Sequence, residues 1–323
     1  MNPELKSENL QKLIFWSHGG PTFAIKDDPF GCAGAFNKVE SLGEKIKNEF
    51  KPDYVVVISA HWQPDYNTPD SLSKLYLSDT KKEAETENEL IYDFYNFPQE
   101  MYSWKFKNTF SKDLIKRISA LQEGTGISVE AAIRGLDHGL WVPGKVAKLD
   151  KPDNEGNLVP VVQLSMLPNS PALGGDGVEI RETLDSHYKL GVLINKIRAD
   201  NGLVVLSGMS VHNLREIQSI SRGTSSPEFK KFNDYLRTLI IADKKEKIAQ
   251  DYNTNSLYKG LMKLGEDENL IRLLLKAHAP GIDHFLPFVI GAGSLTRDEY
   301  FKEVFNQETG SLGWGIYINK KIE

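Results

Sequence analysis

Two apolar runs near the amino terminus, each followed by a histidine, restrict the fold more than any other feature of this chain. Residues 11–16 and 54–58 have the length and composition of buried strands, and the stretch from about Ala33 to Phe50 between them carries apolar residues at helical spacing. A strand, a helix and a second strand indicate a β-α-β unit with parallel strands. His18 and His61 follow the two strands, so we expect them at one edge of a sheet on neighbouring strands, about one strand spacing or roughly 5 Å apart.

The same alternation continues along the chain. Further strands are expected at 129–133, 159–164, 203–206 and 313–318, and helices at about 182–199, 228–249 and 256–276. The pattern predicts an α/β fold, with a single domain whose central, mostly parallel mixed sheet is flanked by helices on both faces. We expect this domain to span residues 11–320 after a polar tail of residues 1–10. Charged or Pro- and Gly-rich segments are expected to form surface insertions at 81–89, 150–157, 168–177 and 221–227.

Composition narrows the possible partners and compartment. The chain of 323 residues carries a net charge of −5, which offers no basic field to attract nucleic acid or anionic lipid. Cys32 is the only cysteine, so neither an intrachain disulfide nor a thiolate zinc cluster is expected. The sequence shows neither a signal peptide nor an apolar run long enough to span a bilayer. We therefore expect a cytoplasmic or nuclear protein that binds neither nucleic acid nor membranes.

Five of the seven histidines lie at strand ends or in loops rich in Gly or Pro: His18, His61, His138, His212 and His284. Imidazole is the commonest side-chain ligand for Zn, Fe, Cu and Ni, so several converging histidines indicate a metal centre. For each residue taken alone, the alternative is a polar group that is satisfied at the edge of the sheet. His212, in an expected turn between a strand and a helix, is a candidate ligand or general base. His138 is assigned to the substrate side, with its ring oriented by Asp137 or another carboxylate.

The remaining histidines and Cys32 are expected to be structural. His187 lies within an amphipathic helix and His278 just before a proline turn, and neither has a Gly-rich setting. Cys32 is expected to be a buried packing residue. The aromatic segment 92–98 is a candidate wall for a pocket, although most aromatic residues in any protein belong to its core.

Six short motifs occur in order between about Ile14 and Gly293, and together they resemble a known family. They are Ser17-His18-Gly19-Gly20-Pro21, Ser59-Ala60-His61-Trp62, Tyr92-Asp93-Phe94-Tyr95 with Phe97-Pro98, Leu136-Asp137-His138-Gly139, Ser207-Gly208 with His212-Asn213-Leu214, and Ala279-Pro280 with Asp283-His284-Phe285-Leu286-Pro287. The chain resembles the DOPA 4,5-dioxygenase-type extradiol ring-cleavage dioxygenases, which are related to the catalytic subunit of protocatechuate 4,5-dioxygenase.

This resemblance implies one mononuclear divalent metal and assigns roles to the five histidines. His18, His61 and His284 match metal-ligand positions, and His138 matches a histidine that faces the substrate. His212 matches a further ligand in the DOPA-type branch and a catalytic base in the protocatechuate branch. The protocatechuate branch completes its ligand set with a glutamate, whereas this chain offers His284. The metal expected in protein as isolated is therefore Zn²⁺, and Fe²⁺ is expected for dioxygenase activity.

The function implied by the resemblance is extradiol cleavage of a catechol, DOPA-like in type, by O2 to give a muconic semialdehyde-type product. His212 and His138 are the candidate catalytic residues, and the small-molecule catechol and O2 are the expected partners. Two alternatives use the same fold. Three histidines and a water would also suit a zinc hydrolase, and a protein that keeps the pocket without catalysis would be a binding module.

Overall fold

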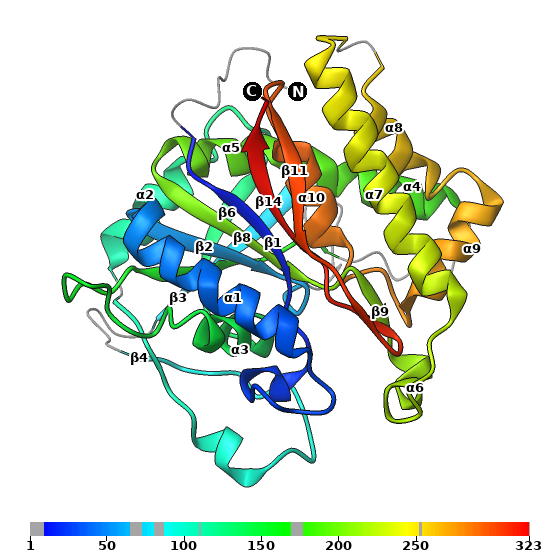
Figure 1. Ribbon diagram of the computed structural model, residues 1–323. Coiled ribbons are helices and arrows are strands. Elements are labelled where there is room, and N and C mark those ends of the chain that lie inside the picture. The colour runs from blue at the N-terminus through cyan, green and yellow to red at the C-terminus, as the bar shows by residue number, and fades with distance from the viewer. Residues whose placement is uncertain are drawn as a thin grey trace.

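The computed structural model describes residues 10–64, 73–80, 87–109, 111–168, 177–251 and 254–322. In this part of the chain, eight strands form one central sheet (Figure 1). In spatial order the strands are β11 (Glu299–Phe305), β14 (Ile316–Lys321), β1 (Leu13–Ser17), β8 (Gly202–Gly208), β2 (Tyr54–Ser59), β7 (Val161–Leu164), β3 (Lys74–Asp79) and β6 (Ser128–Ile133). The expected tail, residues 1–10, lies outside the described residues except for its last member.

The sheet is mixed and mainly parallel, as the sequence predicts. Strands β1, β8, β2 and β7 are parallel neighbours, and β3 and β6 form another parallel pair. Antiparallel pairing joins β14 to β1 and β11, and β3 to β7. The expected strand at 313–318 is wrong in its limits. Trp314 and Gly315 leave the ladder, because Trp314 N–H donates to Gln307 and the Gly315 carbonyl accepts from Ser17.

Helices cover both faces of the sheet. Their bounds are α1 (Ala33–Lys45), α2 (Lys112–Ala120), α3 (His138–Val146), α4 (Gly177–Lys189), α5 (Gly191–Ala199), α6 (Gln218–Ser221), α7 (Pro227–Ile248), α8 (Ser256–Lys263), α9 (Glu268–Ala277) and α10 (Leu286–Ser294). The shorter helical turns are η2 (Pro21–Ala24), the π-helical η3 (Ile46–Phe50), η5 (Gln99–Ser103) and η6 (Leu214–Glu216). No helix in the described ranges is long and apolar enough to cross a membrane.

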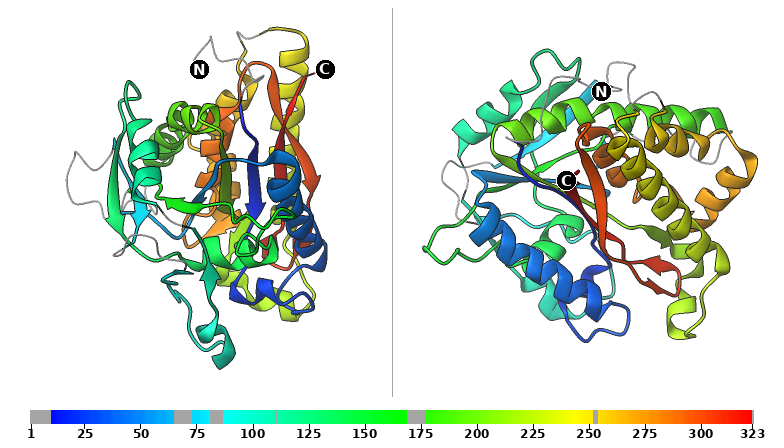
Figure 2. Two further views of the ribbon diagram at one scale, coloured as in Figure 1. Left: turned by 90° about the vertical axis from the view of Figure 1, so that its left-hand side faces the viewer. Right: turned by 45° about the horizontal axis from the view of Figure 1, so that its top comes forward.

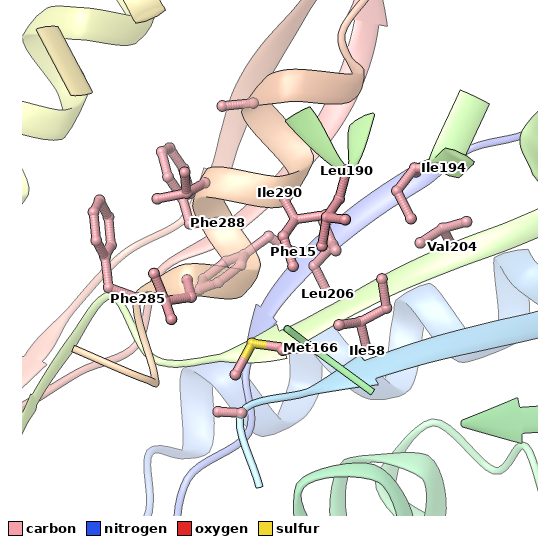
Figure 3. Packing of buried hydrophobic residues seen from close by; sticks show 14 of the residues in the cluster. Phe15, Ile58, Met166, Leu190, Ile194, Val204, Leu206, Phe285, Phe288 and Ile290 are labelled. Carbon is pink, nitrogen blue, oxygen red and sulfur yellow. The ribbon is translucent and has the colours of Figure 1, made fainter. Parts of the chain in front are cut away.

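Alternating residues of the central strands divide the core into two layers. Phe15 of β1 packs in one layer with helices α2, α4, α5 and α7–α10, whereas Ile14 and Trp16 face α1 and α3 on the other side. Figure 3 shows the first layer, where Ile290 of α10 and Leu190 lie beside the strand residues Phe15 and Leu206. A strand buried on both faces reads as a continuous apolar run, which is why the sequence reveals these strands clearly.

Two of the predicted helices are each divided in the structure. The expected helix at 182–199 is interrupted at Leu190, where Gly191 lies so close to Gly293 that a Cβ would overlap the Gly293 carbonyl. The expected helix at 256–276 consists of α8 and α9. The side chain of Asp267 starts α9 by accepting hydrogen bonds from the N–H groups of Asn269 (2.9 Å) and Leu270 (3.1 Å).

Short strands beyond the main sheet position the loops at its carboxyl edge. A second sheet has the order β10 (His278–Ala279), β9 (Val211–Asn213), β13 (Leu312–Gly313) and β12 (Glu308–Thr309). β4 (Glu87–Asn88) and β5 (Phe106–Lys107) form a separate pair. The expected insertion at 150–157 forms turns and 222–226 links α6 to α7. Most of 81–89 and 168–177 lies outside the described residues.

Candidate metal centre

His18 and His61 approach each other across a strand that the sequence did not place between them. β8 separates β1 from β2, so the expectation of neighbouring strands is wrong. The side chains still meet, because His61 lies two residues beyond β2 in a turn in which its N–H donates to Ser59 Oγ at 3.1 Å. The Nε2 atoms of His18 and His61 are 3.2 Å apart.

His284 completes the cluster from the loop that precedes α10. Its backbone carbonyl accepts a hydrogen bond of 2.9 Å from Met209 N–H, which fixes the loop at the end of β8. Its Nε2 atom lies 3.2 Å from His61 Nε2. One ring nitrogen from each of His18, His61 and His284 falls within 4.8 Å of the others, a spacing that suits a single metal ion.

The outer nitrogen of His18 is held by β8. Ser207 Oγ donates to the Gly139 carbonyl, so its oxygen is left to accept from His18 Nδ1 at 3.1 Å and from Trp16 Nε1 at 3.2 Å. This arrangement assigns the His18 proton to Nδ1 and leaves a lone pair on the inward-facing Nε2.

Carboxylates hold the other two rings. Asp283 Oδ2 lies 2.8 Å from His284 Nδ1, and Asp93 Oδ2 lies 3.4 Å from His61 Nδ1. Asp283 thus turns toward its neighbour in the sequence, although it is not itself one of the converging ligands. Partners of this kind fix the tautomer and raise the basicity of a ligating histidine.

Burial keeps these imidazoles neutral, which is the form that binds metals. Loss of hydration lowers the pKa of His18, His61 and His284 well below the ordinary value, and the neighbouring histidines lower it further. Three neutral rings with outward N–H groups would direct three lone pairs toward one another at close range. A cation between them removes this repulsion, so the residues fit a divalent metal ion such as Zn²⁺ or Fe²⁺.

His138 lies beside the cluster as the first residue of α3, and not in a loop as the sequence suggested. Its ring is oriented by Asp93, whose Oδ1 lies 2.7 Å from His138 Nδ1. Asp137, the neighbour considered from sequence, instead accepts from Ser59 Oγ at 2.8 Å and from Arg134 Nη1 at 3.1 Å. The carboxylate that orients His138 thus comes from a distant segment.

Asp93 is shared by His138 and His61, and its charge reflects this position. Burial tends to raise the pKa of Asp93, but the hydrogen bond from His138 and the charges of the two histidines lower it to about 2. An oxygen of Asp93 and one nitrogen from each histidine form a second compact group next to the first. Asp93 is therefore an anion that can hold both rings at neutral pH.

His212 lies on β9, and the expected turn between strand and helix is wrong at this position. Its ring stacks on that of His284, with centroids 3.6 Å apart and an angle of 15° between the planes. The His212 Nδ1 atom is buried and has no hydrogen-bond partner among the described residues. Burial, followed by the charge of His284, lowers the pKa of His212 well below its ordinary value.

The other two histidines and Cys32 do not line the cavity of this site. His187 is buried in α4, where its Nδ1 lies 2.8 Å from the Thr183 carbonyl oxygen. His278 is buried in β10, beside His212 on β9, and packs against Phe232. Cys32 is buried at the start of α1, where burial raises the pKa of its thiol.

A cavity of about 830 Å³ opens over the histidines. All five predicted site histidines line it, together with Asn96, Phe97 and Pro98 of the aromatic segment. Tyr92 and Phe94 of the same segment instead pack around Trp141. Figure 1 shows the 87–107 segment and α6 at the same, lower end of the molecule, and the left view of Figure 2 shows both at that end as well.

The structure adds three supporting residues to the predicted set. The sequence analysis named Asp93, Ser207 and Asp283 only as members of longer motifs and gave none of them a role. A signal was present for all three, because Asp93, Ser207 and Asp283 lie in the motifs on which the family resemblance rests.

Fold and site together define an α/β protein with a candidate mononuclear metal centre at the carboxyl edge of its sheet. Residues 12–311 match the family of the catalytic LigB subunit of aromatic ring-opening dioxygenase, and the chain belongs to this family. It is accordingly an oxidoreductase of the dioxygenase class.

Individual relatives agree with this assignment. The chain is 29% identical over 313 residues to a 4,5-DOPA dioxygenase extradiol of Beta vulgaris, with 96% of this chain and 97% of the relative covered. It is 28% identical over 299 residues to a 4,5-DOPA dioxygenase extradiol-like protein of Schizosaccharomyces pombe, with 88% and 85% covered. The crystal structure of uncharacterized protein JW3007 from Escherichia coli K12 has a TM-score of 0.59 at 19% identity, covering 95% of this chain and 99% of that one, which shows the shared fold.

Proposed function

We propose that this protein cleaves the ring of a catechol, beside the two hydroxyl groups, with one divalent metal bound by His18, His61 and His284. The product would be of the muconic semialdehyde type, and the names of the relatives favour a DOPA-like catechol. The observation that carries the proposal is the convergence of three histidine rings. Each ring has one nitrogen in the cluster, and its other nitrogen lies beside a serine or a carboxylate.

The histidine set binds several divalent metals, but the reaction restricts the active one. When bound, Fe²⁺ would supply open coordination positions at which the catechol oxygens and O2 exchange electrons. Redox-silent Zn²⁺ cannot do this, although it binds nitrogen-rich sites more tightly than Fe²⁺. We therefore expect protein purified in air to carry zinc and to be almost inactive.

His212 is our candidate for the base that removes a proton from the substrate. Two parallel rings 3.6 Å apart direct their in-plane lone pairs side by side, so His212 and His284 do not point toward a common ion. The low pKa of His212 keeps the ring neutral, and its buried Nδ1 has no competing partner within the described residues. A neutral, unpartnered nitrogen next to the metal ligands is suited to accept a phenolic proton.

His138 is our candidate for orienting the catechol. Asp93 holds its Nδ1 at 2.7 Å, which fixes the ring and leaves Nε2 for a substrate hydroxyl. The ring centroid of His138 lies 4.0 Å from that of His61, so a group bonded to His138 would be next to the metal site.

The proposal is tested by preparing metal-free protein under argon and loading it with Fe²⁺ and ascorbate, or with Zn²⁺. Catechol and DOPA are then added under O2, and oxygen uptake and product absorbance are recorded together. We expect both signals only in the iron-loaded protein. Absence of product from every catechol, or equal turnover by the zinc form, would contradict the proposed reaction.

A further inference from the structure

One wall of the cavity is apolar and is assembled from distant parts of the chain. Its side chains come from the loop before α1, the end of β8, the η6–α6 turn and β13. They are Phe30, Met209, Leu214, Ile217, Ile220 and Leu312. Leu214 is the first residue of η6, and Ile217 directly follows it. This turn therefore presents two aliphatic side chains to the cavity, three residues apart in the sequence.

Apart from the histidines, the ionisable groups that line the cavity within the described residues are carboxylates. Among the described lining residues, the charged side chains apart from the histidines are Asp28, Asp93 and Asp283. Asp28 is fixed near the apolar wall, since its Oδ2 accepts from Thr22 Oγ1 at 2.8 Å and from Phe30 N–H at 3.0 Å. An anionic substituent on the substrate would therefore meet negative charge as well as apolar carbon.

Resting on the proposed function of catechol cleavage, but departing from the DOPA-like side chain that the relatives' names favour, we propose that the preferred substrate is a catechol whose ring substituent is apolar and carries no carboxylate. The diol lies at the histidines, and the substituent lies against Leu214, Ile217 and Ile220. A cavity of about 830 Å³ is near the upper end of the roughly 300–1,000 Å³ that small-molecule sites occupy, so it has room for more than a bare catechol.

The size of the effect follows from the burial of apolar surface. Each methylene that leaves water for the apolar wall should increase affinity about threefold to fourfold, until the wall is covered. A carboxylate at the end of a chain of the same length gains less, because it must lose hydration near Asp28.

Binding is measured first, by calorimetry on zinc-loaded protein, which does not consume the ligand. The ligands are catechol, 4-methylcatechol, 4-propylcatechol, dopamine and 3-(3,4-dihydroxyphenyl)propionate. We expect affinity to rise along the alkyl series and to be at least tenfold lower for the propionate than for 4-propylcatechol. Tighter binding of the propionate or of dopamine would overturn the proposal.

A matched pair of variants then tests the location of the wall. Leu214 and Ile241 are both exposed aliphatic residues, at 47% and 48%, but only Leu214 lines the cavity. Leu214→Lys should weaken 4-propylcatechol binding and improve propionate binding by about tenfold each, whereas Ile241→Lys on α7 should leave both unchanged. Equal effects of the two substitutions, or no effect of Leu214→Lys, would place the substituent elsewhere.

Turnover separates this inference from the function on which it rests. With iron-loaded protein, kcat/KM should follow the same order as affinity. If bare catechol is cleaved but the propionate is preferred, the ring-cleavage proposal stands and the apolar substrate class is wrong. If no catechol is cleaved while the affinity order holds, the apolar wall is supported and the reaction is wrong.

Discussion

Each converging histidine depends on a different neighbour for the orientation of its ring. His18 relies on a serine hydroxyl, whereas His284 and His61 rely on the carboxylates Asp283 and Asp93. A charged acceptor raises the basicity of the ligand more than a hydroxyl does, so the carboxylates should contribute more to metal affinity.

Asp283→Ala should weaken metal binding by about 10–100-fold, because His284 loses the acceptor that fixes its tautomer. Asp283→Asn keeps an acceptor oxygen and should lose less. Competition with a chromophoric chelator measures both affinities. Equal affinity in Asp283→Ala and the unmodified protein would show that this carboxylate does not support the metal site.

The two remaining site histidines are separated by metal content and turnover. His212→Ala should keep its metal and lose roughly 10²–10⁴-fold in single-turnover cleavage, as expected for a missing general base. His138→Ala should also keep its metal but mainly raise the catechol concentration needed for half-saturation. Metal loss in His212→Ala would show that His212 is a fourth metal ligand. Metal loss only in His138→Ala would show that the roles assigned to His212 and His138 are the wrong way round.

For single residues, the sequence predicted which histidines line one cavity better than it predicted the hydrogen-bond partners of their rings. Gly-rich and strand-end settings marked the five residues that line the cavity. Their hydrogen bonds depend on tertiary structure: His138 takes Asp93 from a distant segment in place of its neighbour Asp137, and Asp283 turns toward His284. Sequence separation does not reveal which of two nearby acids faces a ring.

At the scale of elements, the start of α3 lies close to the ends of β1 and β2, and this close approach requires a glycine at position 139. A Cβ there would lie 2.8 Å from His61 Cδ2 and 3.3 Å from His18 Cε1, and it would also collide with Ser59 Oγ. The start of α3 therefore packs directly on two of the candidate ligands.

Gly139→Ala should displace these rings and reduce metal occupancy at least tenfold, while the two core layers keep the protein folded. Gly20→Ala is the matched control, because a Cβ at Gly20 meets nothing within 4 Å. Metal analysis with circular dichroism measures occupancy and folding in both variants. Full occupancy in Gly139→Ala would show that the close approach of α3 is not needed.

The elements themselves were predictable where the signal is local. Buried strands such as β2 are continuous apolar runs, and their order along the chain indicated an α/β sheet. Breaks within helices were not predictable, because the break at Leu190 accompanies a contact between Gly191 and Gly293 that is distant in sequence. The insertion of β8 between β1 and β2 is likewise a property of the whole sheet.

For the whole molecule, burial of neutral histidines couples stability to pH. Burial lowers the pKa of His187 to about 4 and that of His278 to about 3. In the unfolded chain both should titrate near the ordinary value of about 6.5. Their contribution to stability is therefore complete above that pH and is lost as the pH falls, because the unfolded state binds protons that the folded state does not.

Each of these histidines should lower the free energy of unfolding by about 1 kcal/mol per pH unit between pH 6 and pH 4, most steeply near pH 5. Urea unfolding of the metal-free protein across this range measures the slope. His187→Leu should make the slope shallower by about that amount. An unchanged slope would show that His187 titrates alike in both states.

The most direct test of the central claim is an anaerobic iron titration of the metal-free protein, with catechol cleavage measured after each addition by admitting O2. If His18, His61 and His284 bind a single catalytic metal, turnover should rise linearly with Fe²⁺ and level off at one iron per chain. The same titration of His284→Ala should remain flat. Full turnover without iron, saturation at another stoichiometry, or an unchanged curve in His284→Ala would contradict this metal centre.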